Sequence, residues 1–286
     1  MAKDSPETMP RPIRHILRRL IKAPAALSIL WPALLLCGGY VSWHQWGAQH
    51  VATKFYLIEE QKIQITAQPD YIPLDIVHTV YEDAAIDRIS LLDSAATAKI
   101  ASAFGSHPWV RDVVSVRKLP GGNLDVHLNY RKPAATVYVT QHRGEEITGF
   151  LPVDADAVAL PTDDFSPSLA DQYLKIYTPG AVFTGNAGDV FDNKGVIAAA
   201  KLAAALSAYQ KRIGIESISV YGDVRDTLNA QLELTTSDGQ RIRWGSAPGE
   251  ESPGESTALM KLQALLKGVR PGTDLRYAGR TTALPY

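Results

Sequence analysis

Residues 107–133 read HPWVRDVVSVRKLPGGNLDVHLNYRKP, and this stretch decides the fold of the region around it. Apolar and polar residues alternate on both sides of residues 120–123, Pro-Gly-Gly-Asn. A period of two is typical of a half-buried β-strand, and proline, glycine and asparagine provide the backbone angles of a chain reversal. We therefore predict a hairpin, with a first strand after Trp109 and a second strand from Leu124 that ends at Pro133, because proline cannot donate to a strand ladder.

The residues before this hairpin predict one strand and two helices. Residues 62–66 (KIQIT) alternate as a short strand, and residues 72–77 (IPLDIV) predict the start of a helix with Pro73 in its first turn. Residues 94–104 (SAATAKIASAF) have helical spacing. The order strand, helix, helix, strand, strand predicts a small α+β module with two helices on one face of a three-stranded sheet.

The N-terminal part of the chain predicts a membrane anchor. Residues 1–22 are polar and rich in arginine and lysine, whereas residues 23–53 carry no charge. The stretch from Ala25 to Trp43 is apolar and long enough to cross a bilayer, which needs ~20 residues. By the positive-inside rule the N-terminus is cytoplasmic. We predict a basic cytoplasmic tail over 1–22, a transmembrane helix over 23–46, and a periplasmic location for the rest of the chain.

Two other interpretations of the apolar segment stay open. A cleaved signal peptide has an apolar region of ~7 to 15 residues and a small-x-small cleavage site. Here the run is longer, and the bulky residues Tyr40 and Trp46 lie two positions before the candidate cleavage residues Ser42 and Ala48. A buried helix of a soluble domain would rarely be flanked by basic residues and tryptophans. These observations favour the uncleaved anchor.

Composition argues against several functional classes. The chain has 286 residues and a formal net charge of -1, so it can hold two folded modules and has no basic field for nucleic acid. Its single cysteine, Cys37, allows neither an internal disulfide nor a thiolate metal site. The sequence contains no HExxH, GxSxG or GxxxxGK[ST] motif. We therefore expect no metal, no cofactor and no enzymatic activity.

Two acidic pairs keep an enzymatic alternative open. Asp154 with Asp156, and Asp163 with Asp164, could serve as general acid and base in a membrane-tethered periplasmic enzyme. Acidic residues in loops are more often simply solvated. Two other residues in or near the hairpin also have two interpretations each. Trp109 is either a core anchor where the second helix meets the sheet or an exposed contact, and Arg131 is either a surface charge or a recognition contact.

Residues 134–286 predict a β-rich mixed domain with flanking helices. Strands are expected at 136–139, 149–154 and 217–221. Alternation over 228–235, an Asp-Gly turn and a return through Trp244 predict a second hairpin.

Two helices are expected in the same part of the chain. Residues 192–212 predict a long helix capped by Asp192 or Asn193. Ser252 and Glu255 predict a capping box for a later helix, which runs through the leucines Leu259, Leu262, Leu265 and Leu266.

This order of elements, with several short motifs, resembles the FtsQ family of bacterial cell-division proteins, called DivIB in Gram-positive bacteria. The resemblance implies a POTRA module (polypeptide-transport-associated domain) over 62–133 and an FtsQ-type β domain over 134–286. The sequence departs from the family after the first strand, where Ala67-Gln68-Pro69 stands in place of the usual Gly-Asn. The matching motifs are Pro108-Trp109-Val110, the strand that ends at Leu119-Pro120, Arg131-Lys132-Pro133, the strand Gly149–Asp154 and Asp274-Leu275-Arg276.

The resemblance also implies a partner-binding site. In that family the C-terminal region engages FtsB and FtsL, and an extended partner segment can add to the unpaired edge of a sheet. The alternative is an ordinary edge strand protected by the charges of Arg276 and Arg280. The residues expected in the partner-binding strand are Asp274, Leu275, Arg276, Tyr277, Ala278 and Gly279.

These features lead us to expect a non-catalytic, single-pass inner-membrane scaffold of the division machinery at the septum. The POTRA module would serve recruitment, and the expected partners are FtsB-like and FtsL-like proteins and the lipid bilayer, through Ala25 to Trp43, without nucleic acid. The alternatives are a POTRA-bearing scaffold for protein export or outer-membrane assembly, and the tethered enzyme.

Overall fold

The protein is an α+β protein with mixed sheets. In the described chain one compact unit contains helix α2 and the segments 56–59 and 87–96, and a second unit contains both of the larger sheets. The predicted tail over residues 1–22 lies outside the described residues. The computed structural model describes residues 24–47, 56–142, 149–165, 167–222, 230–270 and 272–279.

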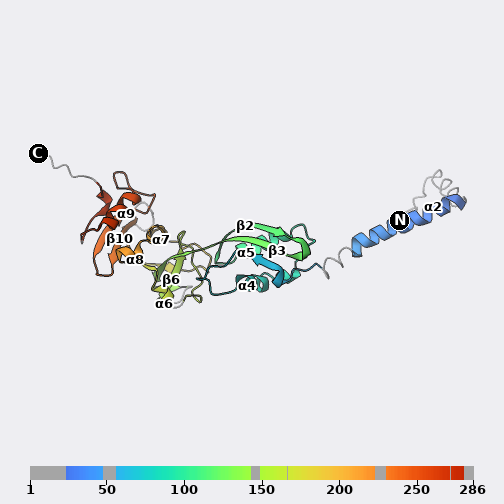
Figure 1. The fold of residues 1–286 in the computed structure, drawn as a ribbon, viewed down its shortest axis with the longest axis horizontal. Helices are drawn as coiled ribbons and strands as arrows, with labels where there is room; N and C mark the ends of the chain where they lie inside the picture. Colours follow the sequence, from blue (N-terminus) through green and yellow to red (C-terminus); the bar gives the residue numbers. More distant parts are fainter. Residues whose placement is uncertain are drawn as a thin grey trace, which may run out of the picture. The chain divides into compact units, whose positions relative to one another are not determined.

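The apolar segment near the N-terminus is helical. Helix α2 spans Pro24–Ser42 and continues into a π-helical turn, η1, at Trp43–Gly47 (Figure 1). Its large apolar side chains from Trp31 to Trp46 are exposed. Across the described part of the chain, no helix combines the length and the apolar composition that crossing a membrane requires. The transmembrane helix predicted over 23–46 is therefore not supported.

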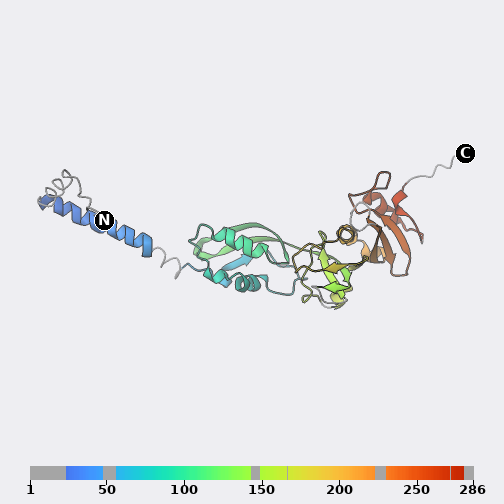
Figure 2. The same cartoon turned by 180° about the vertical axis from the view of Figure 1, so that it is seen from behind.

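The predicted order of strand, helix, helix, strand and strand is confirmed. The three-stranded sheet has the order β1-β3-β2, with β1 parallel and β2 antiparallel to β3, and the helices lie beside it (Figures 1 and 2). Alternation explains β3, whose apolar residues are buried while Asp125 and His127 lie on the other face. The elements are η2 (Glu60–Lys62), β1 (Ile63–Ile65), α4 (Ile76–Asp83), η3 (Ile86–Arg88), α5 (Ala96–Gly105), β2 (Val110–Lys118), η4 (Pro120–Gly122) and β3 (Leu124–Tyr130).

Two local predictions in this region need correction. Helix α4 begins after Asp75, whose carboxylate accepts a hydrogen bond from the Val77 N–H at 2.9 Å, so Pro73 precedes the helix. The second strand of the hairpin ends at Tyr130, and Pro133 begins the next strand, β4. Proline is tolerated there because it is the first residue of a strand.

The second part of the chain forms a six-stranded sheet of order β11-β10-β9-β7-β4-β6. Helix α7 (Lys194–Leu206) packs across one face of this sheet and buries most of its alanine side chains and both of its leucines in the core. The outermost strands are β6 and β11, and a separate pair, β5 (Gln141–His142) and β8 (Val182–Phe183), lies outside the sheet. The sheet strands are β4 (Pro133–Val139), β6 (Gly149–Asp154), β7 (Leu174–Tyr177), β9 (Ile215–Gly222), β10 (Ala230–Thr236) and β11 (Arg241–Gly245).

The helices of this region differ from prediction at their ends. The long helix predicted over 192–212 is divided into α7, capped by Asn193, and α8 (Gln210–Ile213). Helix α9 (Ala258–Lys267) begins after Thr257, whose hydroxyl accepts from the Met260 N–H. The predicted capping box therefore does not cap this helix: Glu255 does accept from the Ser252 N–H, but both residues precede the N-cap Thr257. A short helix, α6, spans Pro167–Ala170.

Candidate partner-binding site

The predicted partner-binding residues form a turn in place of a strand. Leu275–Tyr277 is a 3-10 helix, η5, and Asp274 makes only an isolated bridge to Arg243. The Asp274 carboxylate accepts a hydrogen bond from the Arg276 backbone N–H at 3.1 Å. Such a local side-chain bond competes with extended backbone. The terminal edge strand predicted over 274–279 is therefore wrong.

Residues 272–279, which we call the C-terminal turn, cover part of the outer edge of β11. The Gly272 N–H donates to the Arg241 carbonyl at 3.0 Å, and the Arg243 N–H donates to the Thr273 carbonyl at 3.0 Å. A partner strand would need these same backbone groups of β11. Strand addition at this position therefore requires the C-terminal turn to leave.

Leu275 and Tyr277 differ sharply in exposure. The Leu275 residue is 1% exposed and belongs to the core of the six-stranded sheet, so it holds the turn against the protein. Tyr277 is 53% exposed. Of these two apolar residues of the predicted site, only Tyr277 offers a surface to a partner.

An ion pair fixes the conformation of the C-terminal turn. Arg276 donates from Nε to Asp274 Oδ1 at 3.0 Å and from Nη2 to Asp274 Oδ2 at 2.7 Å. These bonds outweigh the effect of burial and hold the pKa of Asp274 below its ordinary value. The same pairing raises the pKa of Arg276. The Arg276 guanidinium also lies 5.5 Å from the centre of the Tyr277 ring, which restrains that ring.

A buried polar cluster supports the C-terminal turn from the neighbouring loop and helix. Glu255 Oε1 accepts from Lys261 Nζ at 2.6 Å and from the Ser246 N–H at 2.8 Å, and Oε2 accepts from the Ser252 N–H at 3.0 Å. Burial raises the pKa of Glu255, but the hydrogen bonds from Lys261, Ser246 and Ser252 outweigh it and leave that pKa below its ordinary value. The carboxylate therefore stays ionised beside a buried ammonium group.

The cluster reaches the C-terminal turn through Ser256. Its backbone N–H donates to the Arg276 carbonyl, and its hydroxyl donates to the Ala278 carbonyl, both at 2.7 Å. The C-terminal turn also approaches Gly245 closely, and a larger residue would not fit there. The φ of Gly245 is +96°, and an added Cβ would lie 2.6 Å from Arg276 Cγ. The position of the turn therefore depends on side chains from β11, α9 and the loop between them.

The exposed apolar surface near this turn is small. Met260 lies at the turn, since a Cβ added to Gly279 would be 3.5 Å from its methyl carbon. Leu259 and Met260 are both exposed on the first turn of α9. We call Met260 and Tyr277 the C-terminal patch. Isolated apolar residues are normal on a surface, but this patch lies at the C-terminal turn, whose conformation is fixed by hydrogen bonds.

The outer edge of β2 is open. This nine-residue strand pairs with β3 on one side, and no other described strand pairs with it. Register shifts interrupt the pairing, and Val114, which is 62% exposed, has no register partner in β3. Bulges and the charged residues Arg117 and Lys118 limit unwanted pairing at such an edge. The edge can still accept an extended segment through its free backbone groups.

Trp109 and Arg131 have structural roles. Trp109 is fully buried, its Nε1 donates to Asp164 at 2.8 Å, and its ring stacks 5.9 Å from that of Phe165, which confirms the core interpretation. Arg131 donates from Nη1 to Asp154 at 2.8 Å, and only 16% of its side chain is exposed. The surface-charge interpretation of Arg131 is therefore wrong, because this side chain forms a largely buried ion pair, and the recognition contact stays a prediction.

The four acidic residues of the enzymatic alternative have different surroundings. Asp154 binds Arg131, Asp164 accepts from the Trp109 indole, and Asp156 pairs with Arg111 at 2.8 Å. Asp163 is exposed. Within the described ranges, no three His, Cys, Asp or Glu side chains gather closely enough to hold a metal ion. Asp154, Asp156 and Asp164 thus each contribute to structure through a separate contact.

Sequence reasoning missed the buried cluster and the open β2 edge. Lys261 lies among apolar residues at helical spacing, and a lysine in such a stretch is ordinarily placed on the solvent face. The edge position of β2 follows from the parallel pairing of β1 with β3, which alternation along the chain does not reveal.

Comparison of the chain with protein-family models and with curated proteins finds no match.

Proposed function

We propose that this protein is a non-catalytic scaffold of the bacterial division machinery, of the FtsQ and DivIB type. The observation that carries the proposal is the nine-residue β2 strand, whose outer edge has no partner strand in the described chain. Backbone N–H and C=O groups along such an edge bind an extended partner segment. The β1-α4-α5-β2-β3 order supports a POTRA module around this edge.

A second contact of the proposed scaffold lies at the C-terminal turn. Tyr277 directly follows the Asp274-Leu275-Arg276 motif and is exposed, and Arg276 restrains its ring. FtsB-like and FtsL-like proteins are the partners that the resemblance suggests. Buried Leu275 supports the surface from within and does not contact a partner.

Localisation in dividing cells is the first test of the proposal. A fluorescent fusion of the full chain is expected to gather at mid-cell as the septum forms. Even distribution around the envelope throughout the cell cycle would contradict a division role and favour a scaffold for export or outer-membrane assembly. The proposal does not depend on the anchor predicted over residues 23–46, and carbonate extraction of the full chain tests that anchor separately.

Strand addition at β2 is tested with a proline at Val114. Proline at Val114 removes one backbone donor of β2 and hinders the pairing of an added segment, and its cost to the fold is small because Val114 lies at a bulge. Val114→Pro is expected to weaken partner capture by about tenfold, whereas the control Val114→Thr keeps the N–H and the binding. Equal capture of FtsB-like and FtsL-like proteins by both variants would reject the β2 edge as the binding element.

The C-terminal patch is tested with Tyr277→Ala. Truncating an exposed aromatic contact is expected to weaken capture of the same partners by about tenfold or more without unfolding the protein. Val190→Ala provides the control, since Val190 is also an exposed apolar residue but lies outside the patch. If both variants bind like the original chain, the C-terminal turn has no direct part in partner binding.

A further inference from the structure

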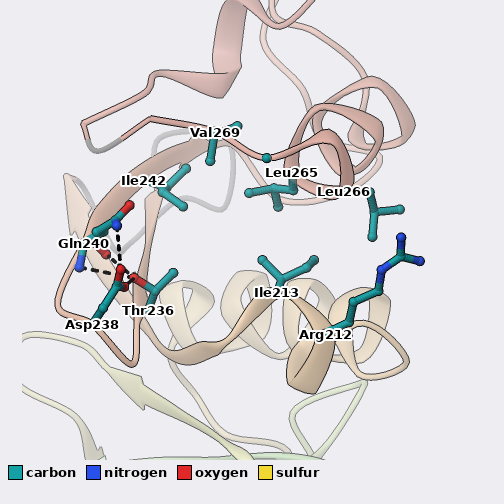
Figure 3. A pocket seen from close by; sticks show the side chains of 10 residues that line it. Arg212, Ile213, Thr236, Asp238, Gln240, Ile242, Leu265, Leu266 and Val269 are labelled. Carbon is teal, nitrogen blue, oxygen red and sulfur yellow. Dashed lines mark hydrogen bonds between the residues drawn. The ribbon is translucent and has the colours of Figure 1, made fainter.

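A pocket of about 290 Å³ opens where the β10–β11 turn, α8 and the end of α9 meet (Figure 3). All three elements belong to the unit that contains the six-stranded sheet. Aliphatic side chains from the three elements point toward a common space, and Ile242 and Leu265 among them are buried. We call this space the hairpin pocket. Its aliphatic lining consists of Ile213, Ile242, Leu265, Leu266 and Val269.

Opposite charges stand on two sides of the hairpin pocket. On one side Asp238 accepts hydrogen bonds from the Thr236 hydroxyl and the Gln240 amide, as Figure 3 shows. The bond from Thr236 is the main reason that the pKa of Asp238 lies below its ordinary value, so the carboxylate is ionised at neutral pH. On the other side lies Arg212, whose guanidinium has no hydrogen-bond or ion-pair partner among the residues described.

Size and charge together restrict the occupant. Pockets for drug-sized ligands are typically about 300–1,000 Å³, so this one, at the lower end of that range, suits a short segment better than a large cofactor. A purely anionic amphiphile would be repelled by Asp238, and a purely cationic one by Arg212. An occupant with an aliphatic centre and opposite charges at its two ends satisfies all three parts of the lining.

We propose that the hairpin pocket binds a segment of a partner polypeptide that inserts one aliphatic side chain. An acidic residue on one side of this anchor pairs with Arg212, and a basic residue on the other side pairs with Asp238. The inference rests on the pocket alone and does not depend on a role in cell division. It adds a third contact surface to β2 and the C-terminal patch.

The proposal is tested with capped tripeptides and the full chain labelled with ¹³C at isoleucine, leucine and valine methyl groups. Because the direction of the bound segment is not specified by the pocket, both Ac-Glu-Leu-Lys-NH₂ and Ac-Lys-Leu-Glu-NH₂ are titrated. One of them is expected to shift the methyl signals of Ile213, Ile242 and Val269 with a dissociation constant of about 1 mM. The same peptides with serine in place of leucine are expected to cause no shift.

Matched variants separate the two charges from general surface effects. Arg212→Glu and Asp238→Asn are each expected to weaken binding by about tenfold or more. Lys211→Glu is the control, because Lys211 is the exposed neighbour of Arg212 but lines a different pocket. The methyl spectrum of each variant reports whether its fold is intact, so loss of binding is distinguishable from unfolding.

Several results would overturn the inference. One is the absence of methyl shifts with either peptide up to about 10 mM. Equal binding of the serine peptides, or unchanged binding by Arg212→Glu, would show that the pocket does not select the proposed segment. Octanoate that binds as tightly as the better peptide would identify the pocket as a site for anionic amphiphiles instead. None of these outcomes bears on the proposed division role, which mid-cell localisation tests separately.

Discussion

The outer edges of β2 and β11 are alike in sequence pattern but differ in what lies against them. Both strands mix apolar and polar residues, regularly in β11 and with breaks at the bulges of β2, and each lies at one end of its sheet. The edge of β2 has no neighbouring strand in the described chain. Part of the edge of β11 is bonded to the C-terminal turn, through Arg241 and Arg243. The segment 274–279 that was expected to be the partner-binding edge strand is thus a turn beside β11, whereas the edge of β2, which was not considered, is open.

The difference shows how an edge strand becomes unavailable. At β11 a short turn satisfies the backbone groups, and this turn is held by Leu275 in the core and by Ser256 beside the Glu255–Lys261 pair. At β2 only bulges and charged side chains limit pairing. Releasing the C-terminal turn should therefore make β11 resemble β2, and variants of the turn test this comparison.

The largest loss of stability is expected for Lys261→Ala. Lys261 is 0% exposed, and its removal leaves the buried Glu255 carboxylate without its counter-ion. Breaking such a pair costs about 3–5 kcal/mol of the free energy of unfolding, measured by urea denaturation. Lys267→Ala in the same helix is the control, because Lys267 is exposed and should change stability by no more than about 0.5 kcal/mol. Similar losses for both variants would mean that the buried pair does not hold this region together.

A somewhat smaller loss is expected for Leu275→Ala. The substitution removes a core side chain and should lower the free energy of unfolding by about 2–5 kcal/mol. It should also speed hydrogen exchange at the Arg243 N–H, which the turn covers, and leave exchange in β2 unchanged. Leu259→Ala is the control for an exposed leucine. Unchanged exchange at Arg243 would show that the edge of β11 is protected without the turn.

The smallest effect is expected for Asp274→Asn. The partly exposed pair with Arg276 should contribute about 0.2–1 kcal/mol at pH 7. Because the folded pKa of Asp274 is lowered, this contribution is present above its unfolded value of about 3.8 and is lost as pH falls through the lower folded value. Urea denaturation between about pH 6 and pH 2 should therefore show a smaller acid loss for Asp274→Asn than for the original chain. Parallel pH profiles would contradict this role of the ion pair.

Much of the fold was predictable from the sequence because alternation is a local property. The hairpin around Pro120–Gly122, the strand β3 and the helix α7 were all expected from their patterns. Helix ends were less predictable, since a cap depends on which nearby side chain accepts hydrogen bonds from the free N–H groups of the first turn. Thr257 caps α9, whereas Glu255 accepts from Lys261, Ser246 and Ser252 before the helix begins.

The candidate site was predictable only in part. The Asp-Leu-Arg motif identified the segment that contains exposed Tyr277, but the expected strand is a turn because Asp274 bonds to the backbone N–H of Arg276. The exposure of α9 also differs from expectation. Leu259 is exposed although it is one of the leucines from which the helix was predicted, and Lys261 is buried. The leucine spacing alone could not reveal the carboxylate that Lys261 meets.

The sequence by itself determined the α+β class, the alternating strands and the main helices, because each residue's side-chain direction follows from its immediate neighbours. Only the tertiary structure decided which sheet edge is open, that Arg131 binds Asp154, and that Lys261 points inward to Glu255. These features depend on groups that the fold brings together from separate elements. Their hydrogen bonds compensate for the loss of hydration on burial, and this compensation exists only after the chain has folded.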